Sequence, residues 1–330
     1  MEFGLQIGGM SGGSIASLRE MATLADTGGF RYLTVPDHFV LEQPGSGIDP
    51  SAPSYEAMTV LGALAASTTH VRVGGMVLCN MFRHPALTAQ AVSTLDHLSG
   101  GRAFLGIGAG WTRAEFDMMG LPFPAVTIRL RMLDEALTVI KLLWTEERAT
   151  MRGEYYMLID AISMPKPLQR PHPPILLGGN GKGLLRIAAR HADILNMTAE
   201  IGRAGTIDLG EVARFNEAAF VAKGEFVRSE ARAAGRDGAA ITLSSIIFML
   251  MITDSADAGD AIAAGMAPMF GIDPADAKRV PFALIGTPDQ IIAELKRRER
   301  EWGMTLTILS GARRDPATIG RFAREILPHV

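Results

Sequence analysis

The pentapeptide VPDHF places two side chains that can carry protons next to each other, Asp37 and His38. Imidazole titrates near neutral pH, and a nearby carboxylate can fix which ring nitrogen holds the proton. Such a pair can bond the edge of a bound ring and move a proton to or from a substrate. The alternative is that Asp37 caps a loop turn and that His38 has no part in chemistry. The residues alone leave both interpretations open.

A glycine-rich segment, LLGGNGKG at 176–183, is the second candidate site. It follows an apolar run and precedes a helical pattern, so its backbone amides and a helix N-terminus would face a bound anion. Gly178, Gly179 and Asn180 would then hold a phosphate, with Lys182 beside them. A tight strand-to-helix turn that needs positive φ angles would produce the same pattern. The segment matches neither the GxGxxG dinucleotide motif nor the P-loop.

Glycines also interrupt the apolar segment VRVGGMVLCNMF at 71–82. Gly74 and Gly75 indicate a bulge there, or a ligand that approaches the backbone closely. Cys79 has no activating base near it in the sequence, which predicts a wall residue rather than a nucleophile. His84 directly precedes a proline and a helical pattern, which favours a helix cap.

Trp111 ends the segment GIGAGW at 106–111. An aromatic ring at this place either lines a ligand pocket or packs beneath the short helix expected at 114–120. Few charged residues follow the expected strands. A site lined mainly by glycines and apolar groups suits a flat, largely uncharged ring better than a metal or a sugar.

The composition excludes several classes of protein. The chain has 330 residues with 32 basic and 35 acidic side chains, and its net charge of -3 lacks the cationic excess of a nucleic-acid surface. A single cysteine allows no internal disulfide and suggests no structural zinc site, so a reducing cytoplasm is expected. The first residues do not resemble a signal peptide, and the most apolar stretch is shorter than the ~20 residues that span a bilayer. We therefore expect a small-molecule substrate, with neither nucleic acid nor membrane as partner.

Short apolar runs alternate with longer helical patterns along the whole chain. Eight βα units favour an α/β (β/α)₈ TIM barrel over an open doubly wound sheet. We expect one domain over residues 1–330, with insertions at about 112–173 and 254–303. In such barrels the chemistry lies at the carboxyl ends of the strands, where the candidate residues fall. The expected strands are 3–8, 32–36, 71–78, 103–108, 175–178, 193–197, 241–251 and 306–309, and the expected helices are 14–27, 55–67, 85–98, 128–145, 182–191, 211–234, 288–302 and 319–327.

Four segments in combination resemble the bacterial luciferase-like superfamily, and within it the branch that depends on coenzyme F420, a deazaflavin. They are VPDHF, RHPALTAQAVSTLDHLSGGRAFLGIGAGW, RGEYYMLID with the following PKPLQRPHPPILLGG, and IGTPDQIIAEL. The resemblance extends over nearly the whole chain and implies the same (β/α)₈ barrel.

The resemblance also implies a role for each candidate residue. Asp37 and His38 would lie at the ring of the cofactor, with His38 as the expected proton carrier. A non-prolyl cis peptide bond between Met76 and Val77 would lie behind the ring. The other implied cofactor-binding residues are Cys79, Gly108, Ala109, Gly110 and Trp111 around the ring, and Gly178, Gly179 and Asn180 at the phosphate.

The chain departs from the F420-dependent glucose-6-phosphate dehydrogenases of this superfamily. Those enzymes have a catalytic Glu where this chain has Trp111, and a ring-facing Trp near the position of Glu42. They also have a phosphate-binding Lys after the sixth strand, where this chain offers no cation before Arg203. We therefore expect an uncharged, apolar alcohol, carbonyl or conjugated alkene as substrate rather than a sugar phosphate.

Together the residues and the resemblance predict an F420-dependent oxidoreductase that moves a hydride between deazaflavin C5 and its substrate, working as a homodimer without a metal. One alternative is an FMN-dependent luciferase-like monooxygenase or reductase that is supplied by a partner flavin reductase. Another is a protein that binds the deazaflavin without catalysis, which the presence of both Asp37 and His38 disfavours.

Overall fold

The central sheet of the protein is built from parallel strands. The structure is a computed structural model that describes residues 1–8, 13–40, 42–43, 47–48, 51–199, 209–274, 276–310 and 315–330. Along the sheet the strands run β5 (Arg72–Gly75), β2 (Tyr32–Val35), β1 (Glu2–Gln6), β15 (Met304–Leu309), β12 (Thr242–Ile247), β11 (Ile194–Met197), β10 (Ile175–Gly178), β7 (Leu105–Gly108) and β6 (Leu78–Cys79).

This sheet closes on itself, because its two ends belong to one continuous segment. β5 and β6 are separated only by Met76 and Val77, and a parallel bridge from Val73 to Ala103 joins β5 to the start of the β7 segment. Counting β5 and β6 together, the strands are those expected of an eight-stranded barrel. The predicted α/β TIM-barrel class is confirmed.

Successive side chains of each strand point alternately into the barrel and toward the helices. Both faces of a strand are apolar because both are buried. In β10, Leu176 belongs to the cluster that fills the barrel, whereas Ile175 and Leu177 pack in the larger cluster under the helices. A parallel strand covered on both sides needs this pattern. The cluster inside the barrel consists of Tyr32, Met76, Phe104, Leu176, Ile194, Ile246, Leu306 and Ile308.

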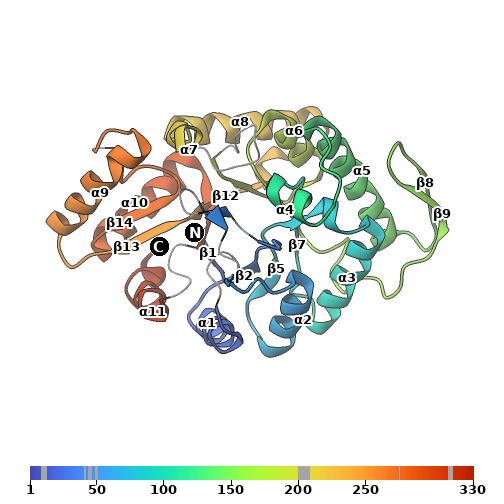
Figure 1. The fold of residues 1–330 in the computed structure, drawn as a ribbon, viewed down its shortest axis with the longest axis horizontal. Helices are drawn as coiled ribbons and strands as arrows, with labels where there is room; N and C mark the ends of the chain where they lie inside the picture. The colour runs from blue at the N-terminus through green and yellow to red at the C-terminus, as the bar shows by residue number, and fades with distance from the viewer. Residues whose placement is uncertain are drawn as a thin grey trace.

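Helices surround the strands (Figure 1). Several begin with the caps that their sequences favour. His84 accepts a hydrogen bond from the amide of Ala86 at 3.2 Å, as predicted, and Thr287 forms a capping box with Gln290. Within the described residues, no helix is long and apolar enough to cross a membrane. The surrounding helices are α1 (Ile15–Thr27), α2 (Ala57–Ser67), α3 (Pro85–Leu98), α5 (Val126–Thr145), α6 (Lys182–His191), α8 (Glu217–Ala233), α10 (Pro288–Trp302) and α11 (Pro316–Glu325).

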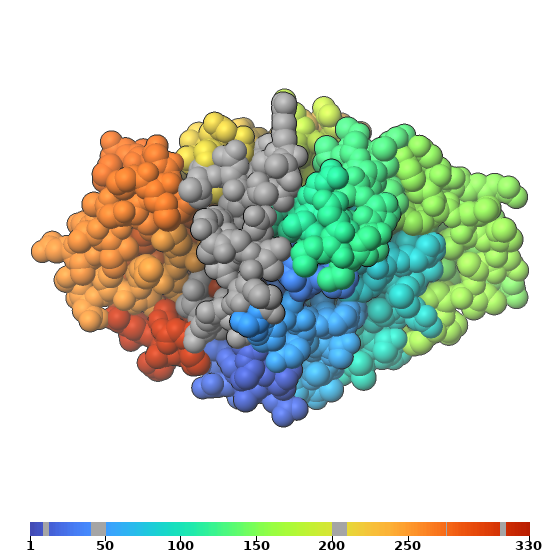
Figure 2. Space-filling model, in the orientation of Figure 1, coloured from blue at the N-terminus to red at the C-terminus, as the bar shows by residue number. Residues whose placement is uncertain are grey.

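Additional elements occupy the long connections. An antiparallel hairpin of β8 (Ala149–Arg152) and β9 (Met157–Ala161) precedes β10, and a parallel pair of β13 (Met249–Ile252) and β14 (Ala283–Gly286) lies between β12 and β15. Figure 2 shows the orange segment that contains α9 (Ala256–Phe270) and the yellow-green segment that contains the hairpin at opposite ends of the long axis. The remaining short elements are β3 (Glu42–Gln43), β4 (Gly47–Ile48), α4 (Arg113–Met118) and α7 (Leu209–Arg214).

Besides the strand expected at 71–78, which is divided into β5 and β6, two predicted elements prove to be divided. The strand expected at 241–251 ends at Ile247, because the amides of Phe248 and Met249 turn to the carbonyl of Phe282 and the chain leaves the barrel to form β13. The helix expected at 211–234 is interrupted before α8, where Asn216 accepts from the amide of Ala219. Asn favours such a cap over a helix interior. Helix α9 and strand β14 were not predicted.

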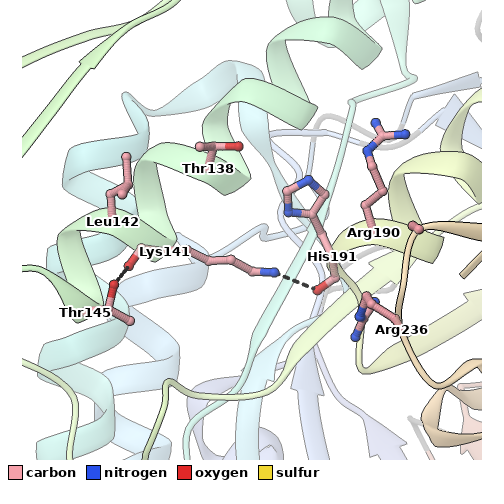
Figure 3. Close-up of a pocket in the computed structure, with 8 residues that line it drawn as sticks. Thr138, Lys141, Leu142, Thr145, Arg190, His191 and Arg236 are labelled. Carbon is pink, nitrogen blue, oxygen red and sulfur yellow. Dashed lines mark hydrogen bonds between the residues drawn. The ribbon is translucent and has the colours of Figure 1, made fainter.

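A cavity of about 410 Å³ opens between α5 and the carboxyl end of α6 (Figure 3). Cationic side chains line the cavity, and some of them donate hydrogen bonds to carbonyl groups at the end of α6. Arg236 donates to the carbonyls of Ala189 and Ala192 at 3.0 and 2.9 Å, and Lys141 donates to the carbonyl of His191 at 3.3 Å. The last carbonyls of a helix lack intrahelical partners and carry partial negative charge. Arg236 and Lys141 therefore cap α6.

Replacing Arg236 with alanine should lower the free energy of unfolding by about 1–3 kcal/mol, since several charge-assisted hydrogen bonds to α6 are lost. Arg232→Ala is the matched control, because Arg232 is exposed in the last turn of α8. Urea denaturation of both variants measures the difference. Equal stability of the two variants would refute the capping role.

Candidate active site

Asp37 and His38 follow β2, and the structure gives each its own partners. Asp37 is buried, and its Oδ2 accepts from the amide of Cys79 at 2.9 Å and from Nη1 of Arg83 at 2.6 Å. Its Oδ1 accepts from Nη2 of Arg83 at 3.0 Å. Asp37 therefore ties the end of β2 to the end of β6. It is not the carboxylate that orients His38, which corrects the sequence interpretation of the pair.

The partner of His38 is Glu115, which the sequence interpretation missed. Glu115 lies on α4 and is 1% exposed, and its Oε2 lies 2.8 Å from Nδ1 of His38. Its Oε1 accepts from the amides of Phe39 and Val40 at 2.6 and 3.0 Å. One buried carboxylate thus holds both the imidazole and the backbone that follows it.

Arg83 extends this network to α2. Its Nη2 also donates to Oε1 of Glu56 at 2.5 Å. Burial raises the pKa of Glu56, but hydrogen bonds from Thr59 and Arg83 outweigh that effect and lower it to about 2. Arg83 therefore lies between two carboxylates, and its charge is compensated within the protein.

The peptide bond between Met76 and Val77 is cis, as the family resemblance implied. The Val77 side chain lies between the ends of β7 and β10. A Cβ atom placed on Gly108 would come within 2.9 Å of Val77 Cγ2, and one on Gly178 within 2.9 Å of Cγ1. Only glycine leaves room for Val77 at these two strand ends. Val77 thus forms an apolar floor at the carboxyl end of the barrel.

Cys79 and the turn after β7 form an adjoining wall. Burial, together with the nearby charges of Asp37 and Glu115, raises the pKa of the Cys79 thiol to about 12, which agrees with a wall residue rather than a nucleophile. A Cβ on Gly110, whose φ is +78°, would lie 2.8 Å from the Cys79 sulfur. Trp111 packs edge-on against the His38 ring at a centroid distance of 5.6 Å, and Ala109 packs on the core.

The glycine-rich turn after β10 leads into α6, whose first amides have no side-chain cap. Gly179 has a φ of +130°, and Asn180 is buried and bonds the carbonyl of Thr198. Gly181 begins α6 without a side-chain cap, and a Cβ at this glycine would meet no described atom within 4 Å. Amides at an uncapped helix start can bind an anion.

A cation that the sequence interpretation missed supports this turn. Nζ of Lys223, on α8, donates to Oδ1 and to the carbonyl of Asn180 at 2.9 and 3.1 Å. Lys182, which the sequence interpretation placed beside the anion, is exposed at the start of α6. The turn therefore has positive charge nearby from a residue that is remote in sequence.

The contacts bring most of the predicted residues together, and Gly179 and Asn180 follow Gly178 directly in the chain. Asp37 bonds Cys79, Cys79 meets Gly110, Trp111 packs on His38, and Val77 separates Gly108 from Gly178. Four other positions near the strand ends lie outside the described residues or have side chains that are not described. Glu42 has an undescribed side chain and Arg203 lies outside the described residues, as do Gly9 and Met10 at the end of the first strand segment.

Sequence comparison finds oxidoreductases of two kinds among the relatives. The F420-dependent glucose-6-phosphate dehydrogenase of Kineococcus radiotolerans is 40% identical over 177 residues, which cover 53% of this chain and 50% of that protein. The FMNH(2)-dependent dimethylsulfone monooxygenase of Pseudomonas putida is 33% identical over 175 residues, 53% of this chain and 46% of that protein. The matches thus span about half the length of these curated relatives.

Solved structures share the fold over almost the whole chain. An F420-dependent secondary alcohol dehydrogenase in complex with an F420-acetone adduct superposes with a TM-score of 0.77 and 21% identity, covering 98% of both chains. The EDTA monooxygenase of Chelativorans sp. BNC1 superposes with a TM-score of 0.79 and 14% identity, covering 99% of this chain and 92% of the other. The model of the luciferase-like monooxygenase family matches residues 1–306. This chain is therefore a member of the luciferase-like monooxygenase family.

Proposed function

We propose that this protein is an F420-dependent oxidoreductase that transfers a hydride between the deazaflavin and an uncharged, apolar alcohol, carbonyl or conjugated alkene. The observation that carries the proposal is the arrangement of three features around the barrel mouth. A proton-carrying imidazole follows β2, the apolar Val77 floor lies between β7 and β10, and an uncapped glycine turn follows β10.

The residues present fit such a cofactor. Val77 offers a flat ring an apolar surface, and the glycines at 108 and 178 leave no side chain to cover it. The start of α6, with Lys223 nearby, suits the phosphate of the cofactor tail. When bound, the deazaflavin supplies a hydride donor or acceptor at its ring carbon C5.

The chain's own contribution is to position and to move a proton. Glu115 and Trp111 hold the His38 ring, whose Nε2 has no hydrogen-bond partner among the residues that the structure describes. Nε2 is the atom that we expect to exchange a proton with the substrate oxygen or carbon. Asp37 keeps the neighbouring backbone in place through Arg83 and Cys79.

The apolar substrate class rests on the side chains around His38. Trp111 contacts the imidazole, and Phe39 pairs with Phe82 at a centroid distance of 4.8 Å. Arg83 is already paired with two carboxylates, so it has no charge to offer a sugar phosphate. Relatives named for glucose 6-phosphate are 36–40% identical over part of the chain, so this sugar phosphate is the competing substrate to test.

An FMN-dependent reaction is the second candidate, and the similarity to the dimethylsulfone monooxygenase favours it. Both cofactors carry a phosphate and a flat tricyclic ring, so the site geometry suits either. Titration of the purified protein with F420 and with FMN, followed by fluorescence, separates the two. We expect saturable binding of F420 at concentrations where FMN does not bind. Preferential binding of reduced FMN, with oxygen-dependent turnover, would overturn the proposal.

Gly181 offers a matched pair of variants for the same titration. Gly181→Asp should fold at least as stably as the wild type, because Asp is a favourable N-cap, yet its carboxylate should weaken cofactor binding at least about 10-fold by occupying the anion site. Gly181→Ala adds no charge and meets no described atom within 4 Å, so it should bind nearly as well as wild type. Equal affinity of the two variants would contradict a phosphate at α6.

A further inference from the structure

We propose that Glu115 is a positioning residue that holds the proton of neutral His38 on Nδ1 and so leaves Nε2 as a proton acceptor. The assignment of the ring proton stands on the geometry of the chain alone. Its kinetic consequence rests on the proposed function. The inference makes neutral His38 the base for oxidation of an alcohol.

The contacts of Glu115 allow one arrangement of the imidazole. Oε1 is held by the amides of Phe39 and Val40, which can only donate, so Oε2 is the oxygen that faces Nδ1 of His38. An ionised carboxylate accepts hydrogen bonds and donates none. At 2.8 Å the contact is therefore an N–H donated from Nδ1 to Glu115.

Nothing else among the described contacts competes for Nδ1. Both oxygens of Asp37 are engaged by Arg83 and Cys79, although Asp37 precedes His38 in the chain. Trp111 packs edge-on against the ring, with an interplanar angle of 77°. The backbone is held as well, because the hydroxyl of Ser54 donates to the carbonyl of His38 at 2.5 Å. The ring is thus fixed in plane and in tautomer.

The chemical step balances with this tautomer. As the hydride leaves the carbinol carbon for oxidised deazaflavin, the substrate O–H bond breaks and its electron pair forms the C=O π bond. The proton forms a new N–H bond at Nε2 of His38. The imidazolium that results carries a positive charge 2.8 Å from the Glu115 carboxylate, which stabilises it.

Glu115→Gln tests the assignment with almost no change of volume. The Gln carbonyl can still accept from Phe39 and Val40, which turns its NH₂ group toward Nδ1 and forces the ring proton to Nε2. Asp117→Asn is the matched control, because Asp117 lies on the same helix, and its side chain is 58% exposed and, among the described residues, is paired with the exposed Arg113 alone. The control makes the same charge change without touching His38.

The first measurement is ¹⁵N NMR of histidine-labelled protein without cofactor, at an alkaline pH where imidazole is neutral, with His38 assigned by the signal lost in His38→Gln. We expect the proton on Nδ1 in the wild type and in Asp117→Asn, and on Nε2 in Glu115→Gln. A proton on Nε2 in the wild type overturns the inference, even if the Glu115 variant fails to fold. A proton that stays on Nδ1 in a folded Glu115→Gln overturns it too.

The second measurement is alcohol oxidation with F420. Glu115→Gln should lower kcat by about 10²- to 10⁴-fold, the range for a lost general base or a wrong tautomer, with KM changed less than about threefold. Unchanged kcat in a variant whose tautomer has switched overturns the role as base. If neither F420 nor FMN supports turnover, the proposed function fails, whereas the NMR result still decides the tautomer.

Discussion

Replacing His38 with alanine should lower kcat by about 10²- to 10⁴-fold while the protein still binds its cofactor, because the site loses the imidazole that exchanges the substrate proton. The cofactor site should persist, since the packing of Val77 between Gly108 and Gly178 and the start of α6 are formed by other residues. Steady-state kinetics and a fluorescence titration on the same preparation measure the two effects separately.

Two further variants make the His38 result specific. The side chain of His38→Gln can still donate a hydrogen bond to Glu115, so the buried carboxylate keeps a partner. An amide cannot accept and release a proton as imidazole does, so the variant should still lose turnover. His70→Ala removes an imidazole whose side chain is 75% exposed and should leave kcat unchanged. Added imidazole should restore part of the activity of His38→Ala. Wild-type turnover by His38→Ala with cofactor bound would refute the proton-transfer role.

Gly106→Ala should destabilise the protein by about 3 kcal/mol or more and abolish cofactor binding. Gly106 lies in β7, and a Cβ there would sit 1.8 Å from the carbonyl oxygen of Gly75, the last residue of β5. Backbone cannot move aside as a long side chain can, so β5 and β7 must separate where the barrel closes. Chemical denaturation gives the change in the free energy of unfolding.

Gly62→Ala is the matched control for Gly106→Ala. Gly62 lies inside α2, and a Cβ there would meet no described atom within 4 Å. Alanine has the higher helix propensity, so this substitution should stabilise the protein by up to about 1 kcal/mol. The same chemical change thus has opposite signs at the two positions. Gly106→Ala with wild-type stability would mean that β5 and β7 are not in close contact.

The sequence predicted those parts of the fold that depend on local pattern. Apolar runs followed by glycines or by VPDHF gave the barrel strands and the residues at their ends, because strand polarity places every carboxyl end at the same mouth. The cis bond at Met76 followed from the family resemblance. The break at Phe248 escaped prediction, since residues 246–252 form one uninterrupted apolar run and only pairing with β14 separates β13 from β12.

The partners of the site residues could not be predicted in the same way. Glu115 meets His38 across 77 positions in sequence, Arg83 meets Asp37 across 46, and Lys223 meets Asn180 across 43. Charged side chains usually face solvent, so the residue types alone gave no reason to place these three inside. A weak signal for Glu115 was its place directly before Phe116 on a short helix after GIGAGW, where both side chains prove to be buried.

The separate anchoring of two adjacent residues has an evolutionary consequence. Asp37 is fastened to Arg83, in the frame of the barrel, whereas His38 is fastened to α4, in a long connection outside the sheet. Changes in α4 can therefore retune the base without loosening barrel closure, and changes around Arg83 would affect folding before they affect chemistry. A lineage built on this plan can diversify its reactions by varying one short helix while it inherits the scaffold unchanged.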